Sequence, residues 1–141
     1  SCMFISKKCF QEIGKFDHNF FLYFEETEYC FRAKKMGYET YQTNKSKVMS
    51  LGRSVEIRNI SEKENIAYVL IWHFIWSKFY FCSKRYGKLL SIFIFVPVLI
   101  RNIFRIVLYI YLNDKKKLKK YRFRLNGLIK SIIGKKSCLR P

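Results

Sequence analysis

Three glutamates that could do acid–base chemistry, Glu25, Glu26 and Glu28, lie within four consecutive positions at the start of a segment with helical periodicity. Successive side chains on a helix are about 100° apart, so Glu26 falls on the side of the apolar residues that follow, and Glu28 projects nearly opposite. Glu28 can then pair with Arg32 at i+4. An inward carboxylate must find hydrogen bonds or line a cleft, so the spacing selects Glu26 as a candidate general base.

The same acids also have a purely structural explanation. Carboxylates in the first turn of a helix complement its dipole, and each stabilises the helix by about 0.3–1 kcal/mol. The catalytic interpretation requires that partial burial and the neighbouring charge of Glu25 tune Glu26 as a base. Spacing alone leaves both interpretations open.

The segment before the acids predicts a short helix and a loop. Ser6 is a suitable N-cap for a helix over residues 7–13, and Gly14 is suited to end it. Phe10 and Ile13 are expected to face inward on this helix. An aromatic-rich loop then leads to the acids.

The segment after the loop predicts a small α/β unit. Residues 25–36 are expected to form a helix with acids in its first turn, bases in its last turn and Gly37 as its stop. Residues 38–43 and 47–51 are expected to form short strands.

A change of pattern at Ser61 predicts a domain boundary. Ser61 and Glu64 have the spacing of a capping box, which would open a long helical run toward Tyr86. We therefore expect two domains, residues 1–60 and residues 61–141.

Positive charge is concentrated in the second half of the chain. Residues 1–64 carry 11 Lys/Arg and 9 Asp/Glu, whereas residues 65–141 carry 17 Lys/Arg and one acid, Asp114. Seven of the ten residues from 115 to 124 are basic. Such a region binds something anionic, either lipid headgroups or nucleic-acid phosphates.

An apolar run from Leu89 to Leu112 precedes the basic segment. Its longest uncharged stretch, residues 89–100, is 12 residues, whereas a spanning helix needs about 20 apolar residues. Arg101 and Arg105 lie one helical turn apart and can share a polar face, so a helix lying in the membrane interface is favoured. A spanning hairpin and a buried core helix remain alternatives.

Cysteine and histidine give no sign of a metal centre. The five cysteines have no metal-type spacing and are expected to be reduced, and the two histidines, His18 and His73, are far apart. No structural metal is expected.

Residues 2–54 resemble the end of the GT-A catalytic domain of family-two glycosyltransferases, in particular the bacterial rhamnosyltransferase-like branch. The resemblance lies in CMFISKKCFQEIGKFD, FFLYFEETEYCFRAKKMGY and KVMSLGRS. In that family Gly-x-Phe-Asp, an aromatic loop, an acidic pair, an Arg six positions later and a Gly-Tyr follow in this order. The resemblance implies an α/β fold, the C-terminal portion of a GT-A domain, followed by long, partly amphipathic membrane-associated helices.

The resemblance also implies roles for the acids. Glu26 matches the second acid of the pair, which serves as catalytic base, and Glu25 matches the first. The base would take a proton from an acceptor hydroxyl as it attacks the anomeric carbon of a nucleotide sugar, with inversion. Asp17, Phe21, Tyr23 and Arg32 would belong to the acceptor side.

The implied enzyme acts at the cytoplasmic face of the membrane, as a peripheral or monotopic protein. Its partners would be a nucleotide-sugar donor, a glycan or lipid-linked acceptor and an anionic membrane surface. A divalent metal, Mg or Mn, would be held by carboxylates upstream, because the chain has no Asp-x-Asp and Ser50 replaces a His common in relatives. We therefore expect a fragment of the enzyme.

Two other classes of function would each account for part of the sequence. A catalytically inactive, membrane-anchored remnant or scaffold would explain Ser50 and the missing donor half. A nucleic-acid-binding protein would explain the interleaved bases and aromatics of KKKLKKYRFR, but it leaves the apolar run and the acidic turn unexplained, so no nucleic acid is expected.

Overall fold

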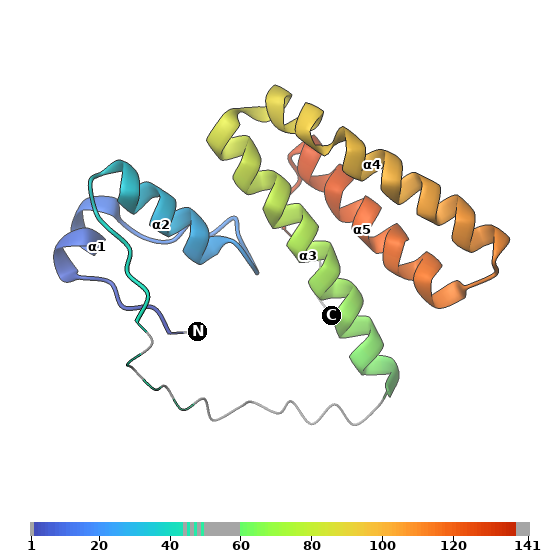
Figure 1. The fold of residues 1–141 in the computed structure, drawn as a ribbon, viewed down its shortest axis with the longest axis horizontal. Coiled ribbons are helices and arrows are strands. Elements are labelled where there is room, and N and C mark those ends of the chain that lie inside the picture. Colours follow the sequence, from blue (N-terminus) through green and yellow to red (C-terminus); the bar gives the residue numbers. More distant parts are fainter. Residues whose placement is uncertain (1, 44, 46, 48, 50–59, 138–141) are drawn as a thin grey trace.

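The computed structural model describes residues 2–43, 45, 47, 49 and 60–137. Within these ranges the chain forms α-helices and no β-strand (Figure 1). The helices are α1 (Lys7–Ile13), α2 (Glu25–Lys35), α3 (Ile60–Tyr86), α4 (Lys88–Tyr111) and α5 (Lys115–Ile133).

The α/β fold predicted from the sequence, and with it the GT-A domain, is wrong for the described residues. Residues 38–43 form no strand, and the second predicted strand, 47–51, lies largely outside the described ranges. A strand needs a neighbour that pairs its backbone groups. Here the amide of Tyr38 donates to the carbonyl of Ala33, at 3.0 Å, and so closes the end of α2 after Gly37, whose φ is 85°.

The first helix begins and ends as the sequence predicts. The Ser6 hydroxyl accepts a hydrogen bond from the Cys9 amide at 3.2 Å, and Gly14 follows the last turn with φ 80°. Ile13 packs against the small core of α1 and α2, as predicted, but Phe10 is 44% exposed, contrary to the prediction. This core consists of Cys9, Tyr29 and Ala33, with Ile5, Ile13 and Tyr38 at its edge.

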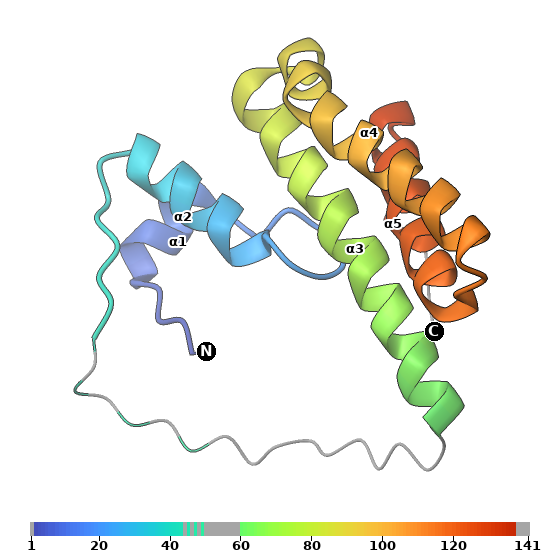
Figure 2. The same ribbon diagram turned by 45° about the vertical axis from the view of Figure 1, so that its right-hand side comes forward.

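Helices α3, α4 and α5 form a three-helix bundle in which each helix packs on the other two. Figure 2 shows α4 and α5 side by side as a hairpin, with α1 and α2 on the other side of α3. The bundle core consists of Ile75, Phe79, Phe95 and Leu128. The described ranges 2–43 and 60–137 each contain a core. The division into residues 1–60 and 61–141 stays a prediction, and residues 50–59 next to its boundary lie outside the described ranges.

Helices α3 and α5 lie very close together at Gly127. A Cβ atom built there would lie 2.7 Å from the backbone oxygen of Trp72. Polar contacts flank this point: the Trp72 indole donates to Asn126 Oδ1 at 2.9 Å, and the Ser131 hydroxyl donates to the carbonyl of Trp76 at 2.9 Å. The close packing of α5 on α3 therefore depends on glycine at position 127, which has no side chain.

Helix α4 buries polar side chains and exposes apolar ones, which is the reverse of an ordinary amphipathic helix. Its buried residues include Ser91 and Asn102, whereas many large apolar side chains point outward, among them Leu89, Phe93 and Phe104. The helix is long and apolar enough to cross a membrane by length and composition. Since most of its apolar face is exposed, the alternative of a buried core helix is wrong.

Substitution of Gly127 by Ala is expected to destabilise the bundle. The new methyl group meets backbone at 2.7 Å, and such overpacking costs about 1–3 kcal/mol. Thermal unfolding followed by far-UV circular dichroism in mild detergent should show a lower midpoint for Gly127→Ala. Lys120→Ala, an exposed substitution on the same helix, is the control; equal midpoints for the two variants would contradict the close approach.

Candidate functional site

The acidic turn opens α2, but it faces the opposite way from the prediction. Glu28 is buried, with 2% of its surface exposed, whereas Glu26 is exposed. The prediction that Glu26 points inward and Glu28 outward is therefore wrong. The predicted pairing of Glu28 with Arg32 is confirmed, since the Arg32 Nε lies 2.9 Å from Glu28 Oε1.

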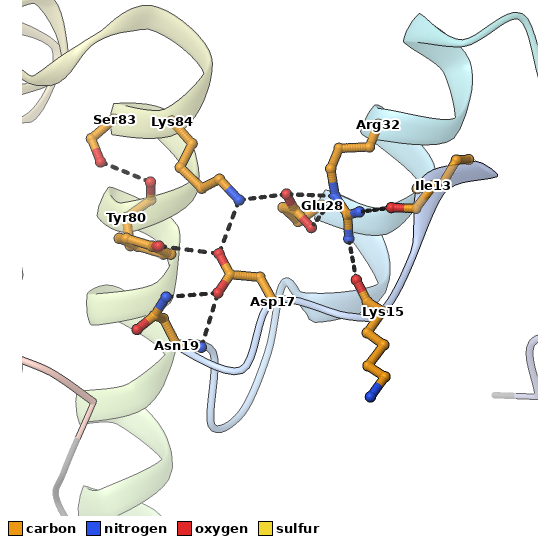
Figure 3. A network of polar contacts seen from close by, with 9 residues as sticks. All are labelled: Ile13, Lys15, Asp17, Asn19, Glu28, Arg32, Tyr80, Ser83 and Lys84. Atoms are coloured by element: carbon orange, nitrogen blue, oxygen red, sulfur yellow. Dashed lines mark hydrogen bonds and ion pairs between the residues drawn. The ribbon is translucent and has the colours of Figure 1, made fainter. Parts of the chain in front are cut away.

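A lysine from the other half of the chain explains the reversal. Helix α2 uses Tyr29 and Ala33 to pack on the small core, and its adjoining face meets α3. There Lys84 Nζ lies 2.6 Å from Glu28 Oε1 and 2.9 Å from Asp17 Oδ2 (Figure 3). Lys84 follows Glu28 by 56 positions, so helical periodicity within α2 could not reveal it.

The Arg32 guanidinium completes this network from within α2. Its Nε contacts both oxygens of Glu28, and its two terminal nitrogens donate to the carbonyls of Ile13 and Lys15 at 2.8 and 2.9 Å (Figure 3). Charge-assisted bonds of this kind are stronger than neutral ones. Arg32 therefore ties α2 to the chain that leaves α1.

Asp17 is held by four donors. Besides Lys84, it accepts from the Tyr80 hydroxyl at 3.1 Å and from the backbone and side-chain nitrogens of Asn19 at 2.9 and 2.8 Å. Partial burial alone would raise the pKa of the Asp17 carboxyl, but the bonds from Lys84 and Asn19 outweigh it and lower the pKa to about 2. Asp17 is thus ionised at neutral pH and fixes the start of the aromatic loop.

The aromatic loop, residues 20–24, is strained and docked on α3. Tyr23 and Phe24 have φ values of 67° and 69°, a left-handed conformation that costs on the order of 1–3 kcal/mol per non-glycine residue. The Ser77 hydroxyl donates to the carbonyl of Leu22 at 2.8 Å, and Phe74 packs against the rings of both strained residues. These contacts with α3 offset the strain.

The loop delivers the chain directly into the acidic pair. Phe24 occupies the N-cap position of α2 and supplies no side-chain cap. Glu25 is half-buried, and its Oε2 is shielded from solvent without a hydrogen-bond partner in the described part of the chain. The neighbouring carboxylate of Glu26 is exposed, so a bound hydroxyl can reach it and give up a proton to it.

The residues predicted for the acceptor side precede and follow the Glu25–Glu26 turn in the sequence. Phe21 and Tyr23 are 45% and 37% exposed, although Phe21 also packs on His73 with ring centroids 4.8 Å apart. Asp17 and Arg32 are instead engaged in the network around Lys84. Ser50 lies outside the described residues.

The described residues do not fit a divalent metal. No three His, Cys, Asp or Glu side chains within them are grouped as a metal site. The carboxylates of Asp17 and Glu28 share the Lys84 ammonium, and a dication there would face its positive charge.

Comparison with known proteins relates part of the chain to glycosyltransferases. Over 35 residues it is 49% identical to the low-salt glycan biosynthesis hexosyltransferase Agl10 of Haloferax volcanii. This stretch is 25% of the chain and 11% of that protein. No protein-family model matches the chain, and no solved structure matches it.

Acid titration is expected to weaken the attachment of the loop to α3. A pKa of about 2 in the folded chain, against about 3.9 when unfolded, means that the Asp17 charge contributes about 2 kcal/mol above pH 4, lost between pH 4 and pH 2. Urea unfolding at several pH values should show the wild-type free energy of unfolding falling between pH 4 and pH 2. In Asp17→Asn it should fall less, because the contribution of the Asp17 carboxylate is absent.

Glu64→Gln is the matched control, because Glu64 forms an exposed ion pair with Lys116, and such pairs contribute little. It should keep the wild-type dependence on pH. An unchanged acid dependence in Asp17→Asn would contradict the role given to the Asp17 carboxylate.

Proposed function

We propose that this chain is part of an inverting glycosyltransferase that moves a sugar from a nucleotide-sugar donor to a polysaccharide or lipid-linked glycan at the membrane. The 35-residue similarity to a hexosyltransferase supports sugar transfer. The observation that carries the proposal is the Glu25–Glu26 turn, presented at the start of α2 by a strained aromatic loop. The similar stretch spans only 11% of that relative, so activity of the whole enzyme belongs to the proposal.

The chemistry assigned to the turn is general base catalysis. One carboxylate of the Glu25–Glu26 pair removes the proton of the acceptor hydroxyl while its oxygen attacks the anomeric carbon. The bond from that carbon to the diphosphate breaks on the opposite side, which inverts the configuration. A base must sit within hydrogen-bond reach of the proton, and the exposed carboxylate of Glu26 meets this need, with the half-buried Glu25 carboxylate beside it.

The acceptor would lie along the aromatic loop. The exposed rings of Phe21 and Tyr23 offer apolar surface for a sugar, while Asp17 and Arg32 act at a distance by holding the loop and α2. In this proposal residues 1–60 carry the acceptor side, residues 61–141 carry the membrane contact, and other residues of the working enzyme bind the donor. No step is assigned to a metal.

We further propose that the bundle binds the anionic cytoplasmic face of the membrane, with α4 lying in the membrane–water interface. The outward face of α4 is apolar and exposed, and the strongly basic α5 packs against another side of α4. Lys117 stacks over Tyr109, and Arg105 donates to the Tyr121 hydroxyl. A spanning α4 would draw these charges toward the hydrocarbon, which is costly, whereas an interfacial hairpin leaves them among headgroups.

Removal of the base is expected to abolish transfer without unfolding the chain. In the complete enzyme, Glu25→Gln and Glu26→Gln should each be assayed for sugar transfer with a radiolabelled nucleotide sugar. The variant that lacks the base should lose about 100-fold or more in rate, and Glu64→Gln, a substitution on α3, should keep wild-type activity.

Wild-type rates in both variants would remove the acidic turn from the mechanism. An inactive wild-type enzyme that still binds membranes would favour the alternative of an anchored scaffold without activity. Far-UV circular dichroism would confirm that each variant keeps its helices.

Replacing the five lysines at the start of α5 by neutral residues is expected to release the protein from anionic vesicles. The variant changes Lys115, Lys116, Lys117, Lys119 and Lys120 to Gln. At about 1 kcal/mol for each basic residue near an anionic leaflet, binding should fall about 100-fold or more in a sedimentation assay.

A variant with five exposed lysines changed elsewhere, Lys7, Lys8, Lys15, Lys34 and Lys63, carries the same change of charge and should bind nearly as well as wild type. Phe93→Ser on the apolar face of α4 should weaken binding to neutral vesicles as well. Equal binding by both lysine variants would contradict a specific role for α5.

A further inference from the structure

A small pocket lies between α2 and the end of α3, beside the polar network. Its volume is about 140 Å³. Its lining consists of Glu28, Phe31, Arg32, Lys35, Phe81, Lys84 and Arg85. The walls thus combine four cationic groups, one carboxylate and two aromatic rings.

Most of this charge is already balanced. Glu28 is shared by Arg32 and Lys84, and Lys84 also contacts Asp17. The two remaining cations, Lys35 and Arg85, have no carboxylate within ion-pair distance in the described part of the chain. The pocket therefore retains a positive charge without a protein counter-charge.

Both of these cations lie over the aromatic ring of Phe31. The Lys35 ammonium lies 4.7 Å from the centroid of the Phe31 ring, and the Arg85 guanidinium lies 5.0 Å from it. Phe31 in turn packs edge-on against Phe81, with centroids 5.9 Å apart. Both positive charges therefore lie close to one ring, and an anion bound beside it would be attracted by both.

The size and chemistry of the pocket select a phosphate group. Pockets for drug-sized ligands have volumes of about 300–1,000 Å³, so a pocket of about 140 Å³ suits a headgroup rather than a whole nucleotide. A guanidinium beside an ammonium is the combination that binds phosphate oxygens, the first through paired bonds and the second as a point charge.

One lining residue of the pocket, Arg85, lies just before the start of α4. Arg85 is two residues before Gly87, where α4 is capped, and the exposed Leu89 and Leu90 follow at once. A phosphate held by Arg85 would therefore lie near the level at which α4 meets a lipid surface.

We infer that Lys35 and Arg85, supported by Phe31, form a binding site for a phosphate or diphosphate group. The group belongs either to a lipid headgroup or to a soluble phosphate ester. The inference stands apart from the proposed sugar transfer, because it depends on the positive pocket and not on the Glu25–Glu26 turn.

The test measures binding of inorganic pyrophosphate to the full chain in mild detergent, by calorimetry at constant ionic strength. The variant Lys35→Gln/Arg85→Gln should bind at least about tenfold more weakly than wild type, since it loses charge-assisted bonds to the anion. The matched control, Lys34→Gln/Lys78→Gln, changes one exposed residue on each of the same helices, removes the same charge and should bind like wild type.

A second arm identifies the source of the phosphate by flotation with vesicles that contain phosphatidic acid. A larger loss of flotation in the Lys35/Arg85 variant than in the control assigns a lipid headgroup, whether or not soluble pyrophosphate binds. Loss of pyrophosphate binding with unchanged flotation assigns a soluble phosphate ester.

The inference is overturned if the two double variants behave alike in both arms, or if wild type binds neither ligand. Both substituted residues of the pocket are exposed, so folding should be kept. Arg85→Lys, which retains the charge, should retain part of the affinity and provides a folded comparison.

Discussion

The shared ammonium of Lys84 is the interaction on which the arrangement of the chain depends. It forms ion pairs with both Asp17 and the buried Glu28, and so joins the loop, α2 and α3 at one point. An unpaired carboxylate at the position of Glu28 would cost several kcal/mol. The pairing therefore fixes which face of α2 turns toward the bundle, and it thereby determines that Glu26 is left in solvent.

The position of the acidic turn follows from that attachment. Asp17 begins the loop and the Ser77 hydroxyl holds its middle, so the backbone strain at Tyr23 and Phe24 is confined between two fixed points. A strained, docked segment loses little freedom when a ligand binds, and this favours a preorganised site. The bundle thus orients the Glu25–Glu26 turn although it contributes no carboxylate to it.

Local chemistry made much of this structure predictable, and distant contacts did not. Ser6, as a helix cap, and the i+4 pair of Glu28 with Arg32 follow from spacing alone, and both are confirmed. The strand expected at residues 38–43 was wrong because β-propensity says nothing of whether a partner strand exists. The inward direction of Glu26 was wrong because Lys84 lies 56 positions beyond Glu28. The acidic pair was selected by type and spacing, whereas nothing in the sequence indicated the Lys35 and Arg85 pocket.

Because the polarity of α4 is reversed, the tendency of the protein to self-associate depends on the solvent around it. Ser91 and Asn102 are turned inward, and many Leu, Ile and Phe side chains are turned outward. The helix therefore exposes a large apolar surface, which water solvates poorly. In aqueous buffer, that surface would draw molecules together. An amphiphile that covers it would keep them apart. The dispersity of a preparation should therefore follow the supply of detergent or lipid more closely than the concentration of the protein.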